Sequence, residues 1–333
     1  MPMHWTIWAI LAGCAGAEPQ PSDDSDTGVS TETGADTDIA LDSDTGADTD
    51  PDTDADTDLP PDTDVSPVLP MEGCEVSGNG SPGGPVEDPY GPYYHNAVGS
   101  TISGGTVVSD VEFLVDHASV PDGALVGGEP RMYYVNGADA SIWTASLDAL
   151  GAAEPIAIDD LLYPVGLADP DAVSMEDGGV RLFLLQRTQT RRSICVAESA
   201  DGVHFEMLGR AAELPTRGTL TDPSVTRLDD GSWLMSLSHG TQTRLARSED
   251  GYAFVLDEGE LQVGGVGELT TADGELRLYT CASGNIQSWT SEDALAFELE
   301  GVVVTAASVN SPSICDPSRI VGTDIFLFKT VDP

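Results

Sequence analysis

Short runs of alternating apolar and polar residues follow one another along the chain after about residue 100. Each run is closed by Gly, Asp or Asn, and the clearest occupy residues 131–135, 180–185, 233–237, 276–280 and 325–328. Alternation of this kind predicts β-strands. No window shows a sustained helical period, so the pattern predicts an all-β protein.

One unit of the pattern recurs along the sequence. In residues 220–238 a strand that begins with Asp222-Pro-Ser is followed by an Asp-Gly turn at Gly231 and a second strand. Asp-Gly turns are expected at Gly123, Gly178, Gly231 and Gly274, with residues 321–324 as a fifth, at spacings of 55, 53, 43 and roughly 49 residues. A second signature, Ser-x-Asp-Gly/Ala-x-x-Phe, occurs at residues 199–205, 248–254 and 291–297.

A repeat of this length with about four short strands has the size of one propeller blade. Five copies predict a five-bladed β-propeller of about 50-residue blades over residues 73–333. The fifth copy contains only two strands, and we expect residues near 100–113 to complete that blade and close the ring. The alternative is a β-sandwich whose turn spacing is coincidental.

The beginning of the chain has the features of an export signal. Residues 5–14 form an apolar run that ends in small residues and Cys14, and it is shorter than the roughly 20 residues that a membrane-spanning helix needs. Leu11-Ala-Gly-Cys14 resembles a bacterial lipobox. We therefore expect residues 1–14 to be a lipoprotein signal peptide and Cys14 to carry a lipid, which is then the only membrane contact. That would place the protein outside the cytoplasm, on the cell envelope, and on the outer membrane in a Gram-negative host. Because no Lys or Arg precedes the apolar run, an ordinary secretory signal is the alternative.

Residues 15–72 are expected to be a disordered linker. Residues 18–70 contain 17 acidic residues, no basic residue and almost nothing apolar. Such a segment cannot offset the entropy cost of ordering, so it suits a tether. Its alternating aspartates lack the order of an EF-hand loop, so we expect only weak, non-specific cation binding there and no cofactor; the sequence gives calcium no support.

The charge of the whole chain narrows the choice of partners. The formal net charge is -44, no Lys or Arg precedes Arg131, and Lys329 is the only lysine. Nucleic-acid binding requires clustered cationic side chains, so it is excluded. Strong self-repulsion favours a soluble monomer.

The cysteines fit an exported protein. Without Cys14 four remain, which allows three pairings. Cys281 closes a second strand in the fourth repeat and Cys315 opens the first strand of the fifth, so this pair is favoured as a disulfide. His117, His204 and His239 show no metal-ligand spacing and are expected to be structural or at the surface. Trp233 and Trp289 lie in strand runs and are expected to pack between blades, although Trp143, Trp233 and Trp289 could also stack on sugars.

The repeated Asp-Pro strand starts, glycine turns and Ser-x-Asp-Gly-x-x-Phe elements resemble the five-bladed glycoside hydrolases of the arabinanase/β-xylosidase type, family 43 and relatives. The resemblance covers roughly residues 110–333. It implies a carbohydrate substrate and carboxylates that project from the innermost strands towards the propeller axis. One carboxylate activates water, another protonates the leaving oxygen, and a third positions the acid.

The resemblance assigns roles to particular residues. The first-repeat aspartate falls on Asp116, as general base, and the third-repeat aspartate on Asp222, as positioning residue; Asp169-Pro-Asp171 and Asp316-Pro-Ser occupy the matching places in the second and fifth repeats. The family acid lies nine residues before the fourth turn glycine, where this chain has Gly265. Glu268, three residues later, is therefore the candidate acid.

Two functions remain open at this stage. The protein is either a tethered glycoside hydrolase that uses Asp116, Asp222 and Glu268, or a non-catalytic carbohydrate-binding or adhesion propeller that has lost its acid. The aspartates that precede proline also have a structural reading, because such residues often cap turns through backbone N–H groups. Convergence of the three carboxylates in one pocket would favour the enzyme.

Overall fold

The computed structural model describes residues 72–74, 76–79, 94–103, 105–107, 111–188, 191–215, 219–271 and 274–332. The expected signal peptide with Cys14, and the expected linker up to residue 71, lie outside the described residues. Among the described residues no helix is long and apolar enough to cross a membrane.

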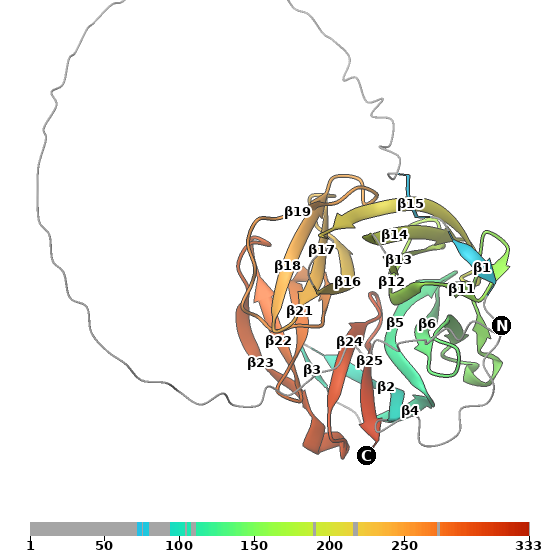
Figure 1. Ribbon diagram of the computed structural model, residues 1–333. Coiled ribbons are helices and arrows are strands. Elements are labelled where there is room, and N and C mark those ends of the chain that lie inside the picture. Colours follow the sequence, from blue (N-terminus) through green and yellow to red (C-terminus); the bar gives the residue numbers. More distant parts are fainter. Residues whose placement is uncertain are drawn as a thin grey trace, which may run out of the picture. The chain divides into compact units, whose positions relative to one another are not determined.

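Antiparallel sheets surround a common axis as the blades of a propeller (Figure 1). The first blade consists of β5 (Ala118–Val126), β6 (Glu129–Asn136), β7 (Ile142–Ser146) and β8 (Glu154–Pro155). The second consists of β12 (Leu167–Ser174), β13 (Val180–Arg187), β14 (Arg192–Ser199) and β15 (His204–Leu214). Two short strands, β9 (Ala157–Ile158) and β10 (Leu161–Leu162), extend the second blade at its outer edge.

The third and fourth blades repeat the plan. The third consists of β16 (Leu220–Arg227), β17 (Trp233–His239), β18 (Gln242–Ser248) and β19 (Val255–Leu256). The fourth consists of β20 (Gly267–Thr270), β21 (Leu276–Ala282), β22 (Asn285–Ser291) and β23 (Glu298–Thr305). In each blade the first strand lies nearest the axis (Figure 1).

The fifth blade joins the two ends of the propeller. Its strands are β24 (Ile314–Arg319), β25 (Ile325–Asp332), β2 (Tyr94–Ser103), β3 (Thr106–Val107) and β4 (Glu112–Val115). β25 pairs with β2 from Ile325↔Thr101 to Asp332↔Tyr94. The predicted five-bladed propeller is confirmed, including its completion by residues near 100–113.

Minor elements complete the description. β1 (Ser77–Asn79) pairs with β11 (Pro164–Val165) in a separate two-stranded sheet. Single-turn 3-10 helices occupy Leu150–Ala152 and Ala306–Val309.

The core is divided among the interfaces between blades. Buried apolar side chains form five clusters. Each cluster joins one blade to its neighbour, because strands of both blades contribute side chains to it. Strand β13 is apolar on both faces because it packs against a neighbouring blade on each side. Phe183 and Leu185 pack towards the third blade, whereas Leu182 and Leu184 pack towards the first. Trp233 and Trp289 belong to such interfaces, as predicted.

The Ser-x-Asp signature forms a turn that is tied to the preceding blade. Ser248 Oγ accepts the N–H of Gly251, and Asp250 accepts the N–H groups of the next residues. The buried carbonyl of Gly251 then accepts a bond from Arg181 of the second blade. The same carbonyl in the second and fourth blades accepts from Tyr133 and Arg247. The repeated signature therefore provides one hydrogen bond between each of these blades and the preceding one.

One predicted turn is wrong. Gly123 lies inside β5, and the turn between β5 and β6 contains Gly127 and Gly128, at φ 59° and 88°. A Cβ on Gly123 would lie 2.6 Å from Ile320 Cδ1, so glycine is needed here for close packing of the first blade on the fifth. In the sequence Asp122-Gly123 looks like a turn, but the glycine is required by packing inside a strand.

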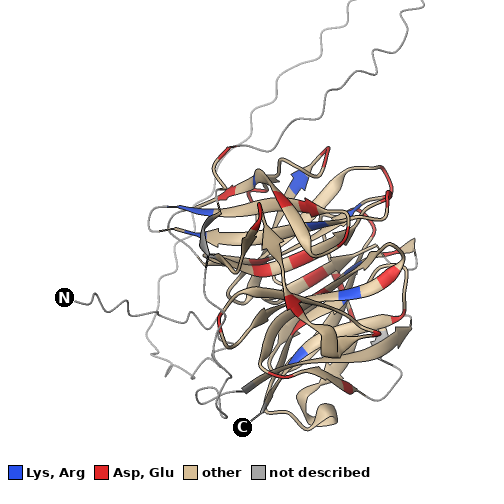
Figure 2. Ribbon diagram, turned by 90° about the vertical axis from the view of Figure 1, so that its right-hand side faces the viewer, with Lys and Arg blue, Asp and Glu red and all other residues tan. Residues whose placement is uncertain are grey.

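Two disulfides stabilise the propeller. Cys281 is joined to Cys315, which is the pair that the sequence favours, and it connects the fourth blade to the fifth. Cys74 is joined to Cys195 and attaches the segment before the propeller to β14. Acidic residues are spread over the blades and outnumber basic ones in the view of Figure 2.

Candidate functional site

The five innermost strands carry equivalent tripeptides near their beginnings. These are Val120-Pro121-Asp122, Asp169-Pro170-Asp171, Asp222-Pro223-Ser224, Val266-Gly267-Glu268 and Asp316-Pro317-Ser318. We call their first and third members the upper and lower ring positions. In four of the strands the pairing register shifts at the tripeptide, as in a β-bulge.

The bulges change which side chains reach the axis. At the upper position Val120, Asp169, Asp222 and Asp316 have φ between 49° and 50°, a left-handed conformation that non-glycine residues rarely adopt. A regular strand presents every second residue to one side. Here successive residues of one tripeptide, such as Val120, Pro121 and Asp122, line the same pocket. Strain held at one place in four blades indicates a site rather than a random irregularity.

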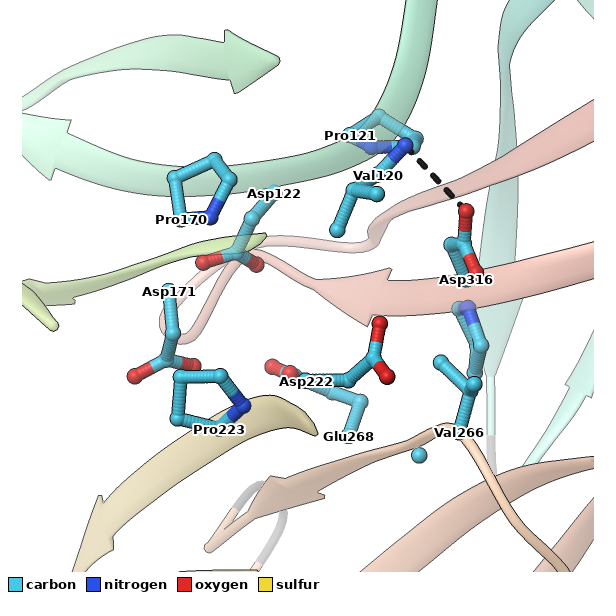
Figure 3. Close-up of a pocket in the computed structure, with 12 residues that line it drawn as sticks. Val120, Pro121, Asp122, Pro170, Asp171, Asp222, Pro223, Val266, Glu268 and Asp316 are labelled. Atoms are coloured by element: carbon cyan, nitrogen blue, oxygen red, sulfur yellow. Dashed lines mark hydrogen bonds between the residues drawn. The ribbon is translucent and has the colours of Figure 1, made fainter. Parts of the chain in front are cut away.

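The pocket lies between the inner strands and is narrow. It is lined by residues from all five tripeptides and encloses a cavity of about 20 Å³. A volume of this size admits about one water molecule. Figure 3 shows the carboxylates of Asp122, Asp171, Asp222 and Glu268 around it, with Pro121, Pro170 and Pro223 alongside.

The lower ring positions connect each blade to the next. Asp122 accepts the N–H of Ala172, Asp171 accepts the N–H of Val225 at 3.1 Å, and Ser224 Oγ accepts the N–H of Leu269 at 2.8 Å. Glu268 accepts a backbone bond from Arg319 in the fifth blade. Ser318 of that blade donates to Asp122 and completes the circle. These side chains therefore hold the ring together, and the three acidic ones also line the pocket.

Three of the lower positions are acidic and close together. One carboxylate oxygen each of Asp122, Asp171 and Glu268 lies within 4.8 Å of the others. All three side chains are buried, and among the described residues none of them forms an ion pair with Lys or Arg. Burial raises the pKa of Asp122 to about 6. Burial, and then the negative charge of the neighbouring carboxylates, raises the pKa of Asp171 and of Glu268 well above its usual range.

The upper positions form a second acidic group. Asp316 pairs with Lys329 at 2.7 Å, with both side chains buried. Burial raises the pKa of Asp169 to about 6, and burial together with Asp169 and Asp316 raises the pKa of Asp222 well above its usual range. Asp222 Oδ2 is buried and has no hydrogen-bond partner among the described residues. A buried acceptor without a donor indicates that something else satisfies it.

The sequence-derived residues separate into two groups. Asp222 and Glu268 both line the pocket, one in the upper ring and one in the lower. Asp116 does not line it: its half-exposed carboxylate lies in the turn before β5 and contacts His117 Nδ1 at 2.9 Å. The first-blade carboxylate in the pocket is Asp122. Asp116 was assigned from the family resemblance, and it lies seven residues before Gly123, not nine as in the second and third blades.

The tripeptides also show which residues occupy the position of Asp222 in the other blades. The upper position is Val120 in the first blade and Val266 in the fourth. The site predicted from the sequence lacks these valines, Asp122 and Lys329, and includes Asp171 only as part of a repeat. Aligning the five tripeptides with one another, instead of counting back from glycine, would have found all but Lys329.

The histidines named from the sequence lie outside the pocket. His117, His204 and His239 each contact one carboxylate, of Asp116, Asp201 and Glu260 respectively. Cys281 and Cys315 lie beside the pocket, since the N–H of Asp316 donates to Cys281 Sγ.

Comparison with known proteins gives likenesses to solved structures. No family model and no curated protein matches the chain. A protein of unknown function from Dyadobacter fermentans aligns at 13% identity over 68% of this chain and 81% of its own, with a TM-score of 0.47. A thermostable family-43 glycoside hydrolase aligns at 11% identity over 65% and 88%, with a TM-score of 0.46. A family 117 glycoside hydrolase from Zobellia galactanivorans aligns at 13% over 72% and 91%, with a TM-score of 0.44.

These likenesses concern the fold. The strand pairing by itself defines the chain as a five-bladed β-propeller.

Proposed function

We propose that this chain is a carbohydrate-binding propeller that does not hydrolyse glycosides by the three-carboxylate mechanism of the family it resembles. The observation behind the proposal is that valine occupies the upper ring position in the first and fourth blades. That mechanism needs two carboxylates besides the one at Asp222, and the upper ring offers none at Val120 or Val266.

The chemistry of the pocket supports a neutral, hydroxyl-rich ligand. Asp222 Oδ2, which has no donor among the described residues, can accept a hydrogen bond from a hydroxyl group. Proline rings between the carboxylates offer apolar faces, which suit the C–H faces of a sugar. The acidic surroundings disfavour an anionic ligand at this pocket. Because the cavity is small, the sugar would contact its mouth.

Binding and hydrolysis can be measured on the same preparation. The full chain is applied to a glycan array and assayed against aryl glycosides and polysaccharides. We expect binding without turnover, and at least tenfold weaker binding by Asp222→Ala because hydroxyl donors lose their acceptor. Asp116→Ala, outside the pocket, is the matched control and should bind as the parent does. Absence of all glycan binding would reject the proposal.

Hydrolysis through the lower ring is the second candidate. Asp122, Asp171 and Glu268 are close, and the raised pKa of Glu268 would keep a proton available to a leaving group near neutral pH. A sugar ring needs more space than the cavity gives, so this function requires the pocket to open. Turnover that Glu268→Gln abolishes and Asp116→Ala preserves would favour it.

We also infer that the protein is exported and anchored through Cys14. The inference rests on Leu11-Ala-Gly-Cys14 and is supported by the two disulfides, which form in oxidising compartments. In a bacterial host, Cys14→Ser should abolish labelling with a radioactive fatty acid and shift the protein from the membrane to the soluble fraction. Unchanged labelling of that variant would contradict the anchor.

A further inference from the structure

Arginines are concentrated at one turn of this acidic chain. Residues 178–197 contain four arginines and no acidic residue, although the whole chain has 57 acidic and only 13 basic residues. Three of these arginines, Arg187, Arg191 and Arg192, lie at the turn between β13 and β14. Figure 2 shows few basic segments among many acidic ones. The positive charge at this turn therefore has to be explained by what it faces.

The turn lies at the end of the propeller that carries the upper ring. β13 runs antiparallel to β12, so Gln186, near the end of β13, is opposite Leu167, at the start of β12. The N–H of Arg187 donates to the carbonyl of Gly166 at 3.3 Å. Asp169, the upper ring residue of this blade, is two residues beyond Leu167. The arginines are therefore placed at the rim of the axial pocket rather than on the opposite side of the molecule.

The side chains of Arg187 and Arg192 are on the face of the second blade that packs against the third. On β13 the odd-numbered side chains pack towards the third blade, and Arg187 continues this alternation. Arg192 is directly opposite Arg187 on the paired strand, and its Nη2 donates to the carbonyl of Leu220 at 2.6 Å. Leu220 begins β16 two residues before Asp222, which is roughly 7 Å along a strand. A group bound between the two guanidiniums would therefore lie beside the pocket and not inside it.

The opposed arginines are an unfavourable arrangement without an anion. Like charges directly opposite each other on paired strands repel. Arg187 is exposed, and among the described residues its side chain forms no ion pair. Burial, and then the positive charge of Arg187, lowers the pKa of Arg192, and the carboxylate of Asp169 opposes this with a smaller effect. An oxyanion between the two side chains would replace the repulsion with charge-assisted hydrogen bonds.

We propose that Arg187 and Arg192 bind an oxyanion of the carbohydrate, a carboxylate or a sulfate ester, next to the sugar unit whose hydroxyls reach Asp222. The planar guanidinium presents paired N–H donors that match two oxygens of such a group. The acidic pocket disfavours an anion, so the unit in the pocket is neutral and the charged group belongs to a neighbouring unit at the rim. Charges beyond about 8 Å are largely screened at physiological ionic strength, so the net charge of the chain does not prevent this contact. The inference rests on the proposed carbohydrate binding and adds the class of ligand, an acidic polysaccharide.

Polysaccharides that differ only in charge test the inference. The full chain is applied to an array of matched pairs, which includes polygalacturonate with its methyl ester and a sulfated galactan with its desulfated form. We expect at least about fivefold tighter binding of the charged member of a pair, because charge-assisted bonds are added. Raising NaCl from about 50 to 500 mM should reduce this preference. The kind of pair that shows the preference distinguishes a carboxylate from a sulfate ester.

Variants assign the preference to the arginine pair. Arg187→Gln removes an exposed charge, so it should reduce the preference to less than about twofold and leave binding of the uncharged member as in the parent, which also shows that the variant is folded.

Arg227→Gln is the matched control, because its exposed arginine lies at the other end of β16 from Leu220, and it should keep the parent's preference. Equal binding of charged and uncharged members by the parent, or a full preference in Arg187→Gln, would overturn this inference alone. Absence of binding to every member would reject carbohydrate binding and the inference with it.

Discussion

The upper ring position is not acidic in every blade, because two of the five blades carry valine there. Val120 and Val266 occupy the ring position that holds aspartate in the other three blades. Val120 has a φ of 50°, which is unfavourable for a β-branched residue. The bulged backbone is therefore kept in the first blade even where the carboxylate is absent.

Gly123 tests the packing at the residue scale. A Cβ there would lie 2.6 Å and 2.7 Å from two carbons of Ile320. Gly123→Ala should lower the free energy of unfolding by about 1–3 kcal/mol, because overpacking displaces the neighbouring side chain. Gly301→Ala, whose added Cβ meets nothing within 4 Å, should change it little. Urea unfolding compares the two, and equal effects would contradict the packing explanation.

Arg181 links the second and third blades, and its substitution tests how much this link contributes to stability. Its buried guanidinium stacks on Trp233 and Tyr252, pairs with Glu198 at 2.7 Å and donates to the carbonyl of Gly251. Arg181→Lys should lower the free energy of unfolding by about 2–4 kcal/mol, since an ammonium cannot form this planar set of contacts.

The matched control is Arg227→Lys, whose ion pair with Glu176 is exposed. It should cost less than about 1 kcal/mol in the same urea titration. Comparable losses in the two variants would mean that the stack contributes no more than a surface pair.

The site was only partly predictable from these residues. Asp222 was found because its Asp-Pro-Ser stretch begins a repeated strand and matches the third-blade aspartate of the family. In the first blade the resemblance selected Asp116, which precedes Gly123 by seven residues, and Gly123 is a packing residue. In the fourth blade the count of nine residues back from the turn glycine failed, because the distance from Val266 to Gly274 is one residue shorter. Turn length varies between blades, whereas the position of each tripeptide on the inner strand does not.

At the scale of elements, short apolar runs closed by turn residues predicted the strands better than residue counts predicted the site. Each blade interface buries both faces of its middle strands, so runs such as β13 are apolar almost throughout and easily recognised. The same reasoning identified Cys281 and Cys315, because strand ends of adjacent blades meet. The pairing of Cys74 with Cys195 could not be predicted, since it depends on where the chain runs before the propeller begins.

The disulfide between the fourth and fifth blades should contribute measurably to stability. Cys281 and Cys315 are separated by 34 residues, and closing a loop of that size is worth about 3–4 kcal/mol in the chain-entropy model. The double change Cys281→Ser with Cys315→Ser should lower the free energy of unfolding by that order. Guanidinium unfolding under non-reducing conditions measures it, with the parent after full reduction as comparison. No loss would show that the blades are held without this bond.

At the scale of the whole molecule, the buried acids set a pH dependence. Asp122 has a folded-state pKa of about 6, against an ordinary value of 3.8. The folded state therefore binds more protons between these values, and this group's contribution to stability falls as the pH rises through about 6. The shift corresponds to roughly 3 kcal/mol. Asp171 and Glu268 face the same pocket and act in the same direction, whereas His95, whose pKa burial lowers to about 4, acts in the opposite one.

Asp122→Asn tests this effect by removing both the group and the effect of its charge on Asp171 and Glu268. In EDTA, the stability of the parent relative to the variant should fall by about 2 kcal/mol between pH 4 and pH 7, measured by urea unfolding at several pH values. Glu129→Gln should show no such trend relative to the parent. A difference between the parent and Asp122→Asn that does not change with pH would show that Asp122 ionises as an ordinary surface aspartate does.

The pairing of β25 with β2 closes the propeller and affects how the molecule folds. Its partners, such as Thr101 and Ile325, are separated by more than two hundred residues, so the fifth blade depends on contacts of very high sequence separation. Such contacts form late, because a long loop must close before they are rewarded. Until then the edges of β2 and β25 remain available to other chains, so this pairing decides whether the ring closes or the chain aggregates.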